Sequence, residues 1–290
     1  MSVPYQTVLI AIDLEDKNLT RLDRSYPNLS HLAQNVFLLT VLENYSFGSE
    51  EERETFLTDK NKQLSEIAAS IHSKTGLSVE PVLKIGKPVK EILKAANSYD
   101  VDLIAMSTHT HVDEKYTKKN AIGSTTEHVV RESKVPVFTF NSNVHLNKIE
   151  KILLPLDLTV ATKQKVTHAV QLAKSVNASI AIVSVLDSIK LGDIKVELDQ
   201  QLAQVKGFIE EENIPCTAAL IESKSGAKSV ATTILNYSEK VGADLIIIMT
   251  QQENKLVKFF MGSSAQTMIR LSEIPVMSII PKDLGFIVGV

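Results

Sequence analysis

The sequence predicts an α/β fold of two tandem, doubly wound domains, each with a five-stranded, mostly parallel sheet flanked by helices. Three observations support this prediction. The length of 290 residues corresponds to about two domains at roughly 150 residues each. The apolar runs are short, continuous and rich in Val, Ile and Leu, which is typical of strands buried on both faces of a parallel sheet. Helical patterns separate these runs, and the whole alternation occurs twice.

Sequence blocks of the first half return in the second half in the same order. Val8–Leu14 reads VLIAIDL and Ile152–Leu158 reads ILLPLDL, and their aspartates are 157 − 13 = 144 positions apart. Gly123-Ser124 and Gly262-Ser263 are 262 − 123 = 139 positions apart. Five such blocks with a slowly drifting offset indicate a tandem duplication.

Each domain is expected to hold five strands. In the first domain, residues 1–143, we expect them near residues 7–13, 36–42, 79–84, 101–106 and 135–140. In the second domain, residues 148–290, we expect them near residues 151–157, 179–186, 216–221, 243–249 and 275–280. The stretch between the two domains is polar and suits a short linker.

The spacing of apolar residues predicts helices between the strands. Residues 63–72 carry apolar side chains at i, i+3, i+4 and i+7. The acidic segment Ser49–Glu52 fits a capping box ahead of this helix, and Gly76 fits its C-terminal cap. Further helices are expected at residues 89–96, 162–175 and 230–237. Pro27 should break the first helix of the first domain, because proline removes a helical hydrogen bond and clashes with the preceding turn.

The composition argues against several classes of protein. The formal net charge of -3 at pH 7 gives no basic excess, so we expect no nucleic-acid partner. No apolar run approaches the roughly 20 residues that span a bilayer, so we expect no membrane partner. The N-terminus lacks the early cationic region of a signal peptide, which favours a cytoplasmic protein. The single cysteine, Cys216, excludes a disulfide or a thiolate zinc cage within one chain.

The order of these motifs resembles the universal stress protein family in its tandem two-domain form. The resemblance rests on a strand ending in aspartate, on an Asp-Leu-Ile strand at Asp102–Ile104 and Asp244–Ile246, and on a Gly-Ser helix start followed by x-Pro-Val. It covers nearly the whole chain, twice. It implies the fold that this family shares with adenine nucleotide α-hydrolase-like proteins. It also implies a stress-response binding module that ATP or another adenine nucleotide regulates.

Nucleotide-binding members of this family carry Gly-x2-Gly-x9-Gly-Ser/Thr after the fourth strand. The first two glycines let the backbone approach a phosphate, and the last one opens a helix whose N-terminal amides favour an anion. The second domain keeps this spacing, but Met249 and Gln252 replace the first two glycines while Gly262 keeps the last. Because its spacing is intact, we favour Gly262-Ser263 as the nucleotide site.

The first domain departs further from the motif. Ser107 and Thr110 replace the first two glycines, and three extra residues precede Gly123. Side chains at these positions crowd a bound polyphosphate in both domains. The alternative interpretation is therefore that the loops became structural after duplication and that neither binds ATP in the usual pose.

The resemblance also assigns roles to the ends of the first two strands of each domain. Asp13 and Asp157 would contact adenine or ribose at the crevice where such sheets bind ligands, and Val41 and Val185 would offer backbone groups to adenine. Alternatively, each aspartate only caps the helix that follows it. The candidate nucleotide-binding residues are Asp157, Val185, Met249, Thr250, Gln252, Gly262, Ser263 and Ser264 in the second domain, and Asp13, Val41, Ser107, Thr108, His109, Thr110, Gly123, Ser124 and Thr125 in the first.

We predict no catalytic residues and do not expect an enzyme. The sequence has no Gly-x-Ser-x-Gly elbow and no Gly-x4-Gly-Lys-Ser/Thr loop. His109, His111 and Asp113 form only an incomplete metal cluster, so no metal site is predicted. The implied cofactor is ATP, with Mg if ATP is bound, and otherwise none. Hydrolysis of a bound adenine nucleotide is a weaker third alternative.

The last strand of each domain is apolar and requires a partner, because an exposed strand presents unpaired backbone groups. In the family, the last strand of one domain pairs with that of another. The two domains can therefore pair within the chain as a pseudo-dimer, and we also expect a homodimer of two chains. The leading hypothesis is the nucleotide-regulated binding module. The alternative is a nucleotide-independent dimeric scaffold or signalling protein with degenerate phosphate loops.

Overall fold

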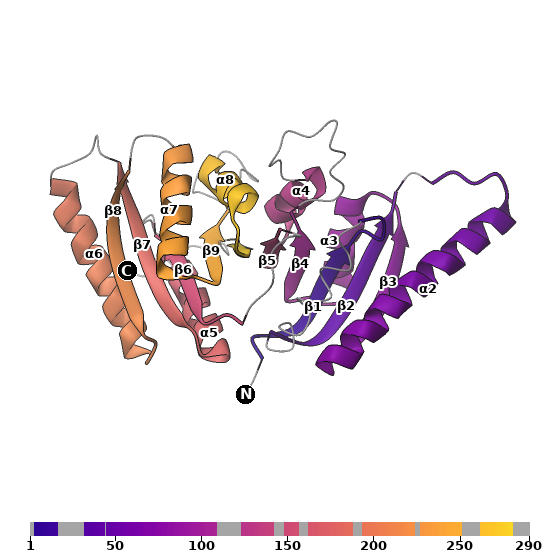
Figure 1. Ribbon diagram of the computed structural model, residues 1–290, viewed down its shortest axis with the longest axis horizontal. Coiled ribbons are helices and arrows are strands. Elements are labelled where there is room, and N and C mark those ends of the chain that lie inside the picture. Colours follow the sequence, from indigo (N-terminus) through magenta and orange to yellow (C-terminus); the bar gives the residue numbers. More distant parts are fainter. Residues whose placement is uncertain are drawn as a thin grey trace, which may run out of the picture.

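The prediction of two tandem doubly wound α/β units is confirmed (Figure 1). The computed structural model describes residues 3–16, 32–43, 45–108, 123–141, 148–156, 162–187, 193–223, 227–250 and 262–280. The strands of the first half are β1 (Tyr5–Ile12), β2 (Ala33–Leu42), β3 (Ser78–Ile85), β4 (Leu103–Ser107) and β5 (Val137–Phe140). The strands of the second half are β6 (Lys151–Pro155), β7 (Ser179–Asp187), β8 (Cys216–Ser223), β9 (Leu245–Met249) and β10 (Val276–Ile279).

Helices follow the strands in both halves. They are α2 (Glu50–Thr75), α3 (Pro88–Ser98) and α4 (Ser124–Glu132) in the first half, and α5 (Thr162–Val176), α6 (Asp193–Glu211), α7 (Ala227–Val241) and α8 (Ser263–Leu271) in the second. The predicted strands agree with the observed ones to within a few residues. Pro27 and most of the predicted linker lie outside the described residues.

Helix α2 begins and ends where its caps predict. The Oγ of Ser49 accepts a hydrogen bond from the Glu52 amide at 3.1 Å, and the Glu52 carboxylate accepts one from the Gly48 amide at 2.8 Å. Gly76 adopts the left-handed conformation (φ 72°), and its amide donates to the His72 carbonyl at 2.8 Å. The helix extends well before residue 63. Its buried residues lie only toward its C-terminal end, which is why apolar spacing detected that part alone; they are Leu64, Ala68 and Ile71.

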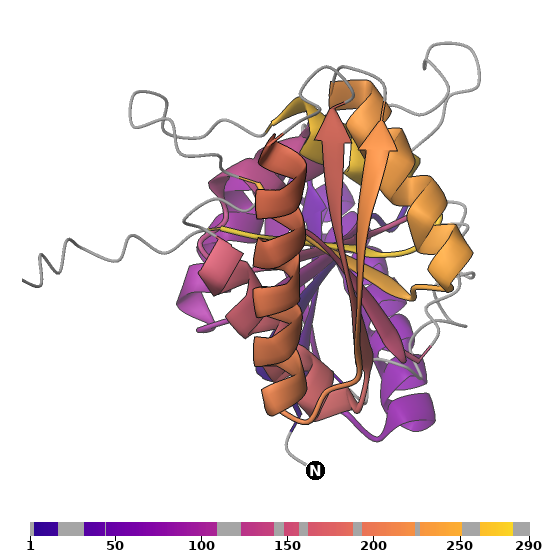
Figure 2. The ribbon, with the colours of Figure 1, turned by 90° about the vertical axis from the view of Figure 1, so that its left-hand side faces the viewer.

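Helices cover both faces of the sheet, as Figure 2 shows from the end of the molecule. Buried side chains of α2, α5 and α6 pack on one face, and those of α3, α4, α7 and α8 pack on the other. The central strands β4, β5, β6, β9 and β10 are almost continuously buried, which explains their uninterrupted apolar sequences, whereas the outer strands β3 and β8 are largely exposed or half-buried. Among the described residues, no helix combines the length and apolar character needed to cross a membrane.

The strands form one ten-stranded sheet in the order β3-β2-β1-β4-β5-β10-β9-β6-β7-β8. Within each half the observed pairings are parallel, and the two halves meet where β5 pairs with β10 in an antiparallel arrangement. The expected intrachain pseudo-dimer is therefore present, with the last strands as its junction. A homodimer of two chains remains a prediction, and it would need surfaces other than these paired strands.

The junction has a local two-fold relation between the halves. Phe138 lies opposite Met277, and these residues are 277 − 138 = 139 positions apart, the same offset that relates Gly123 to Gly262. The two sides are not identical in detail. The Thr139 hydroxyl donates to the Val276 carbonyl at 3.0 Å, whereas the buried hydroxyl of its equivalent, Ser278, has no hydrogen-bond partner among the described residues.

Helices α4 and α8 meet beside this junction (Figure 1). The Gln266 side-chain amide donates to a Glu127 carboxylate oxygen at 3.0 Å, and these residues are again equivalent, 266 − 127 = 139. Two identical halves would place two glutamates or two glutamines here. The tandem chain instead places an amide donor against a carboxylate acceptor, which satisfies both groups.

A second link between the halves lies on the opposite face of the sheet. The Tyr5 hydroxyl of β1 lies 3.2 Å from His168 Nε2 of α5 and donates to the Met277 sulfur of β10 at 3.4 Å. Burial raises the pKa of Tyr5 far above its ordinary value, with a smaller contribution from Asp102. The neutral phenol is therefore the form that the folded chain holds at this contact.

Cys216 lies at the start of β8 and is buried. Burial raises the pKa of its thiol to about 11, and the Glu210 carboxylate adds to the shift. Because the thiolate is the reactive form, this environment favours an unreactive structural thiol.

Replacing Gln266 with Glu is expected to destabilise the junction at neutral pH. The variant sets a second carboxylate against Glu127, which should lower the free energy of unfolding by about 1–3 kcal/mol, the range for leaving a buried or charged group unpaired. Acidification protonates one carboxyl and restores a hydrogen bond, so the loss of Tm should shrink as the pH falls. Thermal unfolding at neutral and mildly acidic pH measures both effects. The control Glu127→Gln removes the charge and should not show this pH dependence, and an unchanged Tm for Gln266→Glu at neutral pH would contradict the prediction.

Candidate functional site

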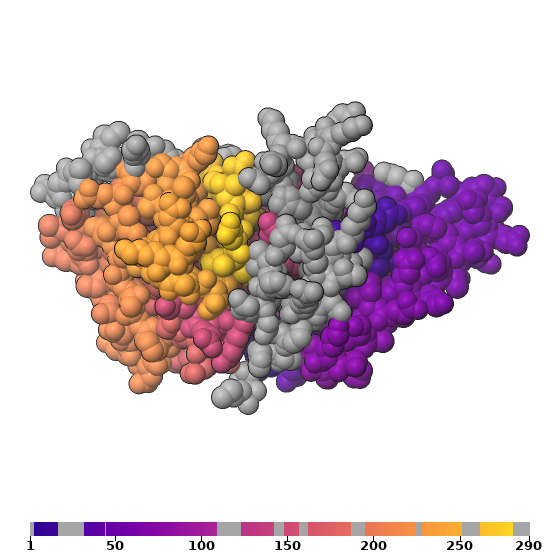
Figure 3. Space-filling view, in the orientation of Figure 1, coloured from indigo at the N-terminus to yellow at the C-terminus, as the bar shows by residue number. Residues whose placement is uncertain are grey.

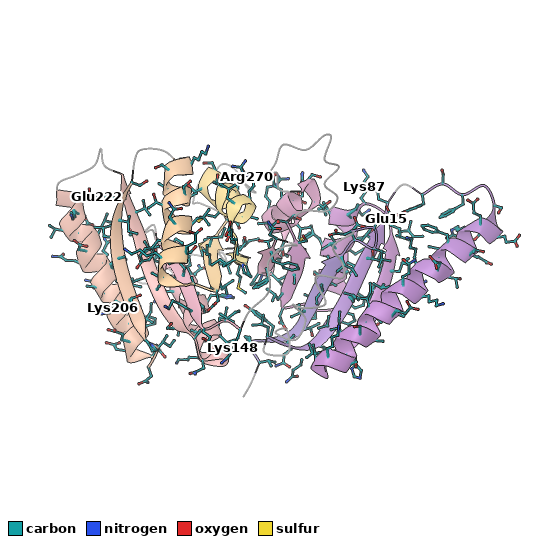
Figure 4. All side chains as sticks on the ribbon, in the orientation of Figure 1. Glu15, Lys87, Lys148, Lys206, Glu222 and Arg270 are labelled. Atoms are coloured by element: carbon teal, nitrogen blue, oxygen red, sulfur yellow. The ribbon has the colours of Figure 1, made fainter. Side chains whose placement is uncertain are left out.

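The parallel strands of each half end at one edge of the sheet. The strand order reverses between β1 and β4 in the first half and between β6 and β9 in the second. Open α/β sheets bind ligands outside the carboxyl ends of the strands at such a point. In Figure 4, Glu15 and Lys87 mark this edge in the first half and Glu222 marks it in the second, while Lys148 lies at the opposite end.

Asp13 follows β1 directly and organises the turn after it. Its Oδ1 accepts a hydrogen bond from the Glu15 amide at 2.9 Å, and its carbonyl accepts one from the Asp16 amide at 3.1 Å. This geometry is an Asx turn at the end of β1, and the helix that Asp13 was expected to cap would lie outside the described residues. Its counterpart Asp157 lies outside the described residues.

Tyr45 links the connection after β2 to the end of β1, a contact that the sequence analysis missed. Its hydroxyl donates a hydrogen bond to a Glu15 carboxylate oxygen at 2.5 Å. The centroid of its ring lies 4.6 Å from the ring centroid of Phe56 and 6.1 Å from that of Phe47. The hydrogen bond to Glu15 raises the pKa of Tyr45 to about 12, with smaller contributions from burial and from the charges of Glu15 and Asp13. An aromatic cluster therefore stands beside the end of β1.

The end of β4 is tied to the start of α4. The Gly123 amide donates to the Thr108 carbonyl at 2.9 Å, and the Thr126 hydroxyl donates to the Ser107 carbonyl at 2.8 Å. The amide of the buried Thr108 donates to the Phe140 carbonyl at 2.9 Å. These bonds hold the two ends of the loop together and place Ser124 and Thr125 in the first turn of α4. The other two predicted loop residues, His109 and Thr110, lie outside the described residues.

The second half has a similar but sparser arrangement. The amide of the buried Thr250 donates to the Ile279 carbonyl at 3.2 Å, and Gly262 precedes α8 with φ -59° and ψ 146°. The first turn of α8 holds Ser263 and Ser264, as predicted. The half-buried Met249 packs against the apolar core. Gln252 lies outside the described residues.

Val41 and Val185 lie within the parallel ladders near the same edge. Val41 is opposite Lys84 of β3, and Val185 is opposite Ile221 of β8. Both side chains are partly buried against the core on the face that carries α3, α4, α7 and α8. Their predicted role, which concerns backbone groups, remains a prediction.

A groove of about 540 Å³ opens between α3 and α4 in the first half. The apolar part of its lining comes from Pro88, Val89 and Leu93 of α3. The charged and hydroxyl side chains that line it are Glu43, Lys87, Lys90, Ser124, Thr125, His128 and Glu132. Ser124 and Thr125 are predicted site residues, and Lys87 and Lys90 are not among them.

Two helices begin at this groove. Lys87 is the N-cap of α3 and Gly123 is the N-cap of α4, and neither helix has a side-chain cap hydrogen bond at this position. The first turn of a helix carries unpaired amides and a partial positive charge. Each first turn also holds a carboxylate, Glu91 in α3 and Glu127 in α4, which interacts favourably with this partial charge.

No group of three histidine, cysteine, aspartate or glutamate side chains converges on a possible metal position among the described residues. His109, His111 and Asp113, the incomplete cluster considered from the sequence, lie outside the described residues.

Comparison with known proteins agrees with this architecture. The model of the universal stress protein family matches residues 4–140 and again residues 148–279. Universal stress protein MJ0531 of Methanocaldococcus jannaschii is 25% identical over 144 residues, which cover 45% of this chain and 82% of the relative. A universal stress protein of Archaeoglobus fulgidus has a similar solved structure, with a TM-score of 0.75 and 22% identity over 94% of this chain and 98% of that one. A putative universal stress protein of Pseudomonas aeruginosa matches with a TM-score of 0.65 and 16% identity over 96% and 94% of the two chains.

Replacing Glu15 with Gln should lower the pKa of Tyr45 from about 12 toward 10.0, because the charged acceptor is lost. Ultraviolet titration of the phenolate measures this shift, and a Tyr45→Phe variant identifies which tyrosine titrates. Because folding raises this pKa, the stabilisation from Tyr45 is fully present below its unfolded pKa and is lost as the pH rises through its folded pKa. A titration curve that Glu15→Gln leaves unchanged would contradict the contact.

Proposed function

Because the chain belongs to the universal stress protein family and carries its domain twice, we propose that it is a binding module regulated by an adenine nucleotide. The ligand would occupy the carboxyl edge of the sheet, where the predicted site residues of the first half lie. Its binding would order the start of α4 and so adjust the surface that this helix presents to partners. The proposed role is binding, without turnover of the nucleotide.

The groove between α3 and α4 is the observation that supports this proposal most. Its volume of about 540 Å³ falls in the range of roughly 300–1,000 Å³ found for small-ligand sites. Ser124 and Thr125, which the family motif assigns to phosphate, line it. Gly123 leaves the start of α4 without a side-chain cap, so a phosphate oxygen can take that place.

The groove supports the first half as a site, and much of the corresponding loop of the second half, residues 251–261, lies outside the described residues. The intact motif spacing had favoured Gly262-Ser263, but spacing alone does not report the shape of the surface around a loop. The connections between β4 and α4 and between β9 and α8 differ in length. We therefore propose the first half as the principal nucleotide site and retain the second as the weaker candidate.

The described residues fit a phosphate-bearing ligand better than a separately held metal ion. The groove is lined by the hydroxyls of Ser124 and Thr125 and by Lys87 and Lys90, which are groups that bind phosphate oxygens, and also by the carboxylates of Glu43 and Glu132. No three metal-ligating side chains converge among the residues described. Mg would therefore accompany ATP and be held mainly by its phosphates, as is usual for this ion.

Two matched variants test the proposal. Gly123 and Gly262 have nearly the same backbone conformation, with φ -59° in both, so valine fits the backbone at either position. Gly123→Val should weaken ATP binding in isothermal titration by roughly tenfold or more, since its side chain obstructs the approach to the helix start and a factor of ten corresponds to only about 1.4 kcal/mol. Gly262→Val should leave the affinity close to that of the unmodified protein.

The first measurement is mass spectrometry of small molecules released when freshly purified protein is denatured. Stoichiometric ATP, ADP or AMP is the expected result. No released nucleotide, together with no heat and no thermal shift at saturating ATP, would overturn the proposal and favour the nucleotide-independent scaffold. Phosphate release from ATP faster than in the Gly123→Val variant would instead favour a hydrolase.

A further inference from the structure

We propose that β8 is a docking strand, and that its partner is the β8 strand of a second copy of this chain, paired with it in antiparallel orientation. This proposal does not depend on the nucleotide site. It adds to the expected homodimer the surface that would form it. The ten-stranded sheets of two chains would then join into one continuous sheet.

The sheet has two outer strands, β3 and β8. Among the described residues, each of them pairs with one neighbour only, β3 with β2 and β8 with β7. Figure 2 views the molecule from the end that carries β8, which lies between α6 and α7. An outer strand presents a row of backbone N–H and C=O groups that can pair with another strand.

The pairing registers show which residues of the two outer strands are equivalent. Val36 of β2 lies opposite Val79 of β3. Ile180 of β7, which follows Val36 by 180 − 36 = 144 positions, lies opposite Cys216 of β8. Because 144 is also the offset between the first strands of the two halves, β3 and β8 are equivalent with an offset of 216 − 79 = 137.

The backbone groups of Ala218 in β8 point away from β7. The Ile180 amide donates to the Pro215 carbonyl at 2.9 Å, and the backbone groups of alternate residues in a strand point to the same side. The N–H and C=O of Ala218 therefore face outward, where a further strand would lie. With the offset of 137, the equivalent residue of β3 is Pro81, which has no N–H to donate.

The outer edge of β3 is protected against pairing, and that of β8 is not. Proline and charged side chains, lysine above all, are the usual protection of an edge strand. β3 carries Pro81 and Lys84, whereas β8 has Ala218 and Ile221 at the equivalent positions. Ala218 is exposed and Ile221 is half-buried. This difference favours β8 over β3 as the strand that takes a partner.

The sequence of β8 is compatible with pairing to its own copy. The antiparallel register with the longest overlap centres on Ala219 and sets Ala218 opposite Leu220 of the second copy. Glu222 is the only charged residue of β8. In this register the two copies of Glu222 lie at opposite ends of the pair, roughly 20 Å apart at about 3.3 Å per residue. Like charges are therefore not set opposite each other.

The chain already contains one contact of this kind. β5 and β10 are the equivalent last strands of the two halves, and they pair in antiparallel orientation. Pairing of β8 with its copy would repeat this arrangement between two chains. It would also close at two chains, because the same strand is used on both sides and the other edge, β3, carries Pro81.

The test is Ala218→Pro, which gives β8 the residue that β3 has at the equivalent position, and the control is Pro81→Ala. Sedimentation equilibrium of the full chain should show a dimer in equilibrium with the monomer. Ala218→Pro should raise the dissociation constant of this dimer by roughly tenfold or more, because each copy loses one outward N–H donor. Pro81→Ala should leave the constant unchanged.

A cross-link tests the same pairing without a proline in the strand. Ala219→Cys in a Cys216→Ser background would set two thiols opposite each other, at a separation that a disulfide can span. Mild oxidation should then produce a linked dimer on a non-reducing gel. Thr217→Cys in the same background is the matched control, because its two copies would lie about 13 Å apart and should not link.

Three results would overturn the proposal. A monomer at every concentration would do so, and would leave the edge of β8 to a strand of another protein. A dimer that folded Ala218→Pro leaves intact, or that Pro81→Ala weakens equally, would place the interface elsewhere. A dimeric Ala219→Cys chain that does not cross-link would contradict the antiparallel pairing itself. No nucleotide takes part in these measurements, so their failure leaves the proposed function standing.

Discussion

The antiparallel pairing of β5 with β10 is the contact on which the rest of the structure depends. Each half alone would end in an apolar edge strand, β5 or β10, whose backbone N–H and C=O groups on one side are unpaired. Such an edge is a template for aggregation. Pairing within the chain removes both edges at once and produces one continuous sheet. Figure 3 shows the second half, in orange and yellow, on the left and the first half, in indigo and purple, on the right.

Helix α4 connects that junction to the candidate site. Ser124 and Thr125 in its first turn line the groove, and Glu127 in the same turn accepts the hydrogen bond from Gln266 of α8. A nine-residue helix packed on a sheet moves as a unit because the surrounding core is close-packed. The proposed ligand at the start of α4 would therefore contact the same helix that bonds to the other half. This arrangement provides a physical route from ligand to assembly without a long pathway.

The sequence predicts the fold well because its signals are local or repeated. The caps of α2 at Ser49 and Gly76 depend on residues within a few positions, and the strands are recognisable because each motif appears twice. The site is less predictable. The contact of Tyr45 with Glu15 and the groove between α3 and α4 depend on how distant segments pack, and no spacing in the sequence encodes that packing. The preference of the motif spacing for Gly262-Ser263 stays a prediction, because the spacing counts residues in a loop whose middle, residues 251–261, lies outside the described residues.

The unequal residues at the junction have an evolutionary consequence. In a dimer of identical chains, one mutation at the two-fold axis changes both sides of the contact together, so a favourable unlike pair cannot arise in one step. Fusion of the copies removes this restriction, and Glu127 with Gln266, or Thr139 with Ser278, records separate histories on the two sides. The buried hydroxyl of Ser278 then becomes a position where a single substitution alters one half only. A fused pair can in this way specialise one copy for a ligand while the other keeps the scaffold intact.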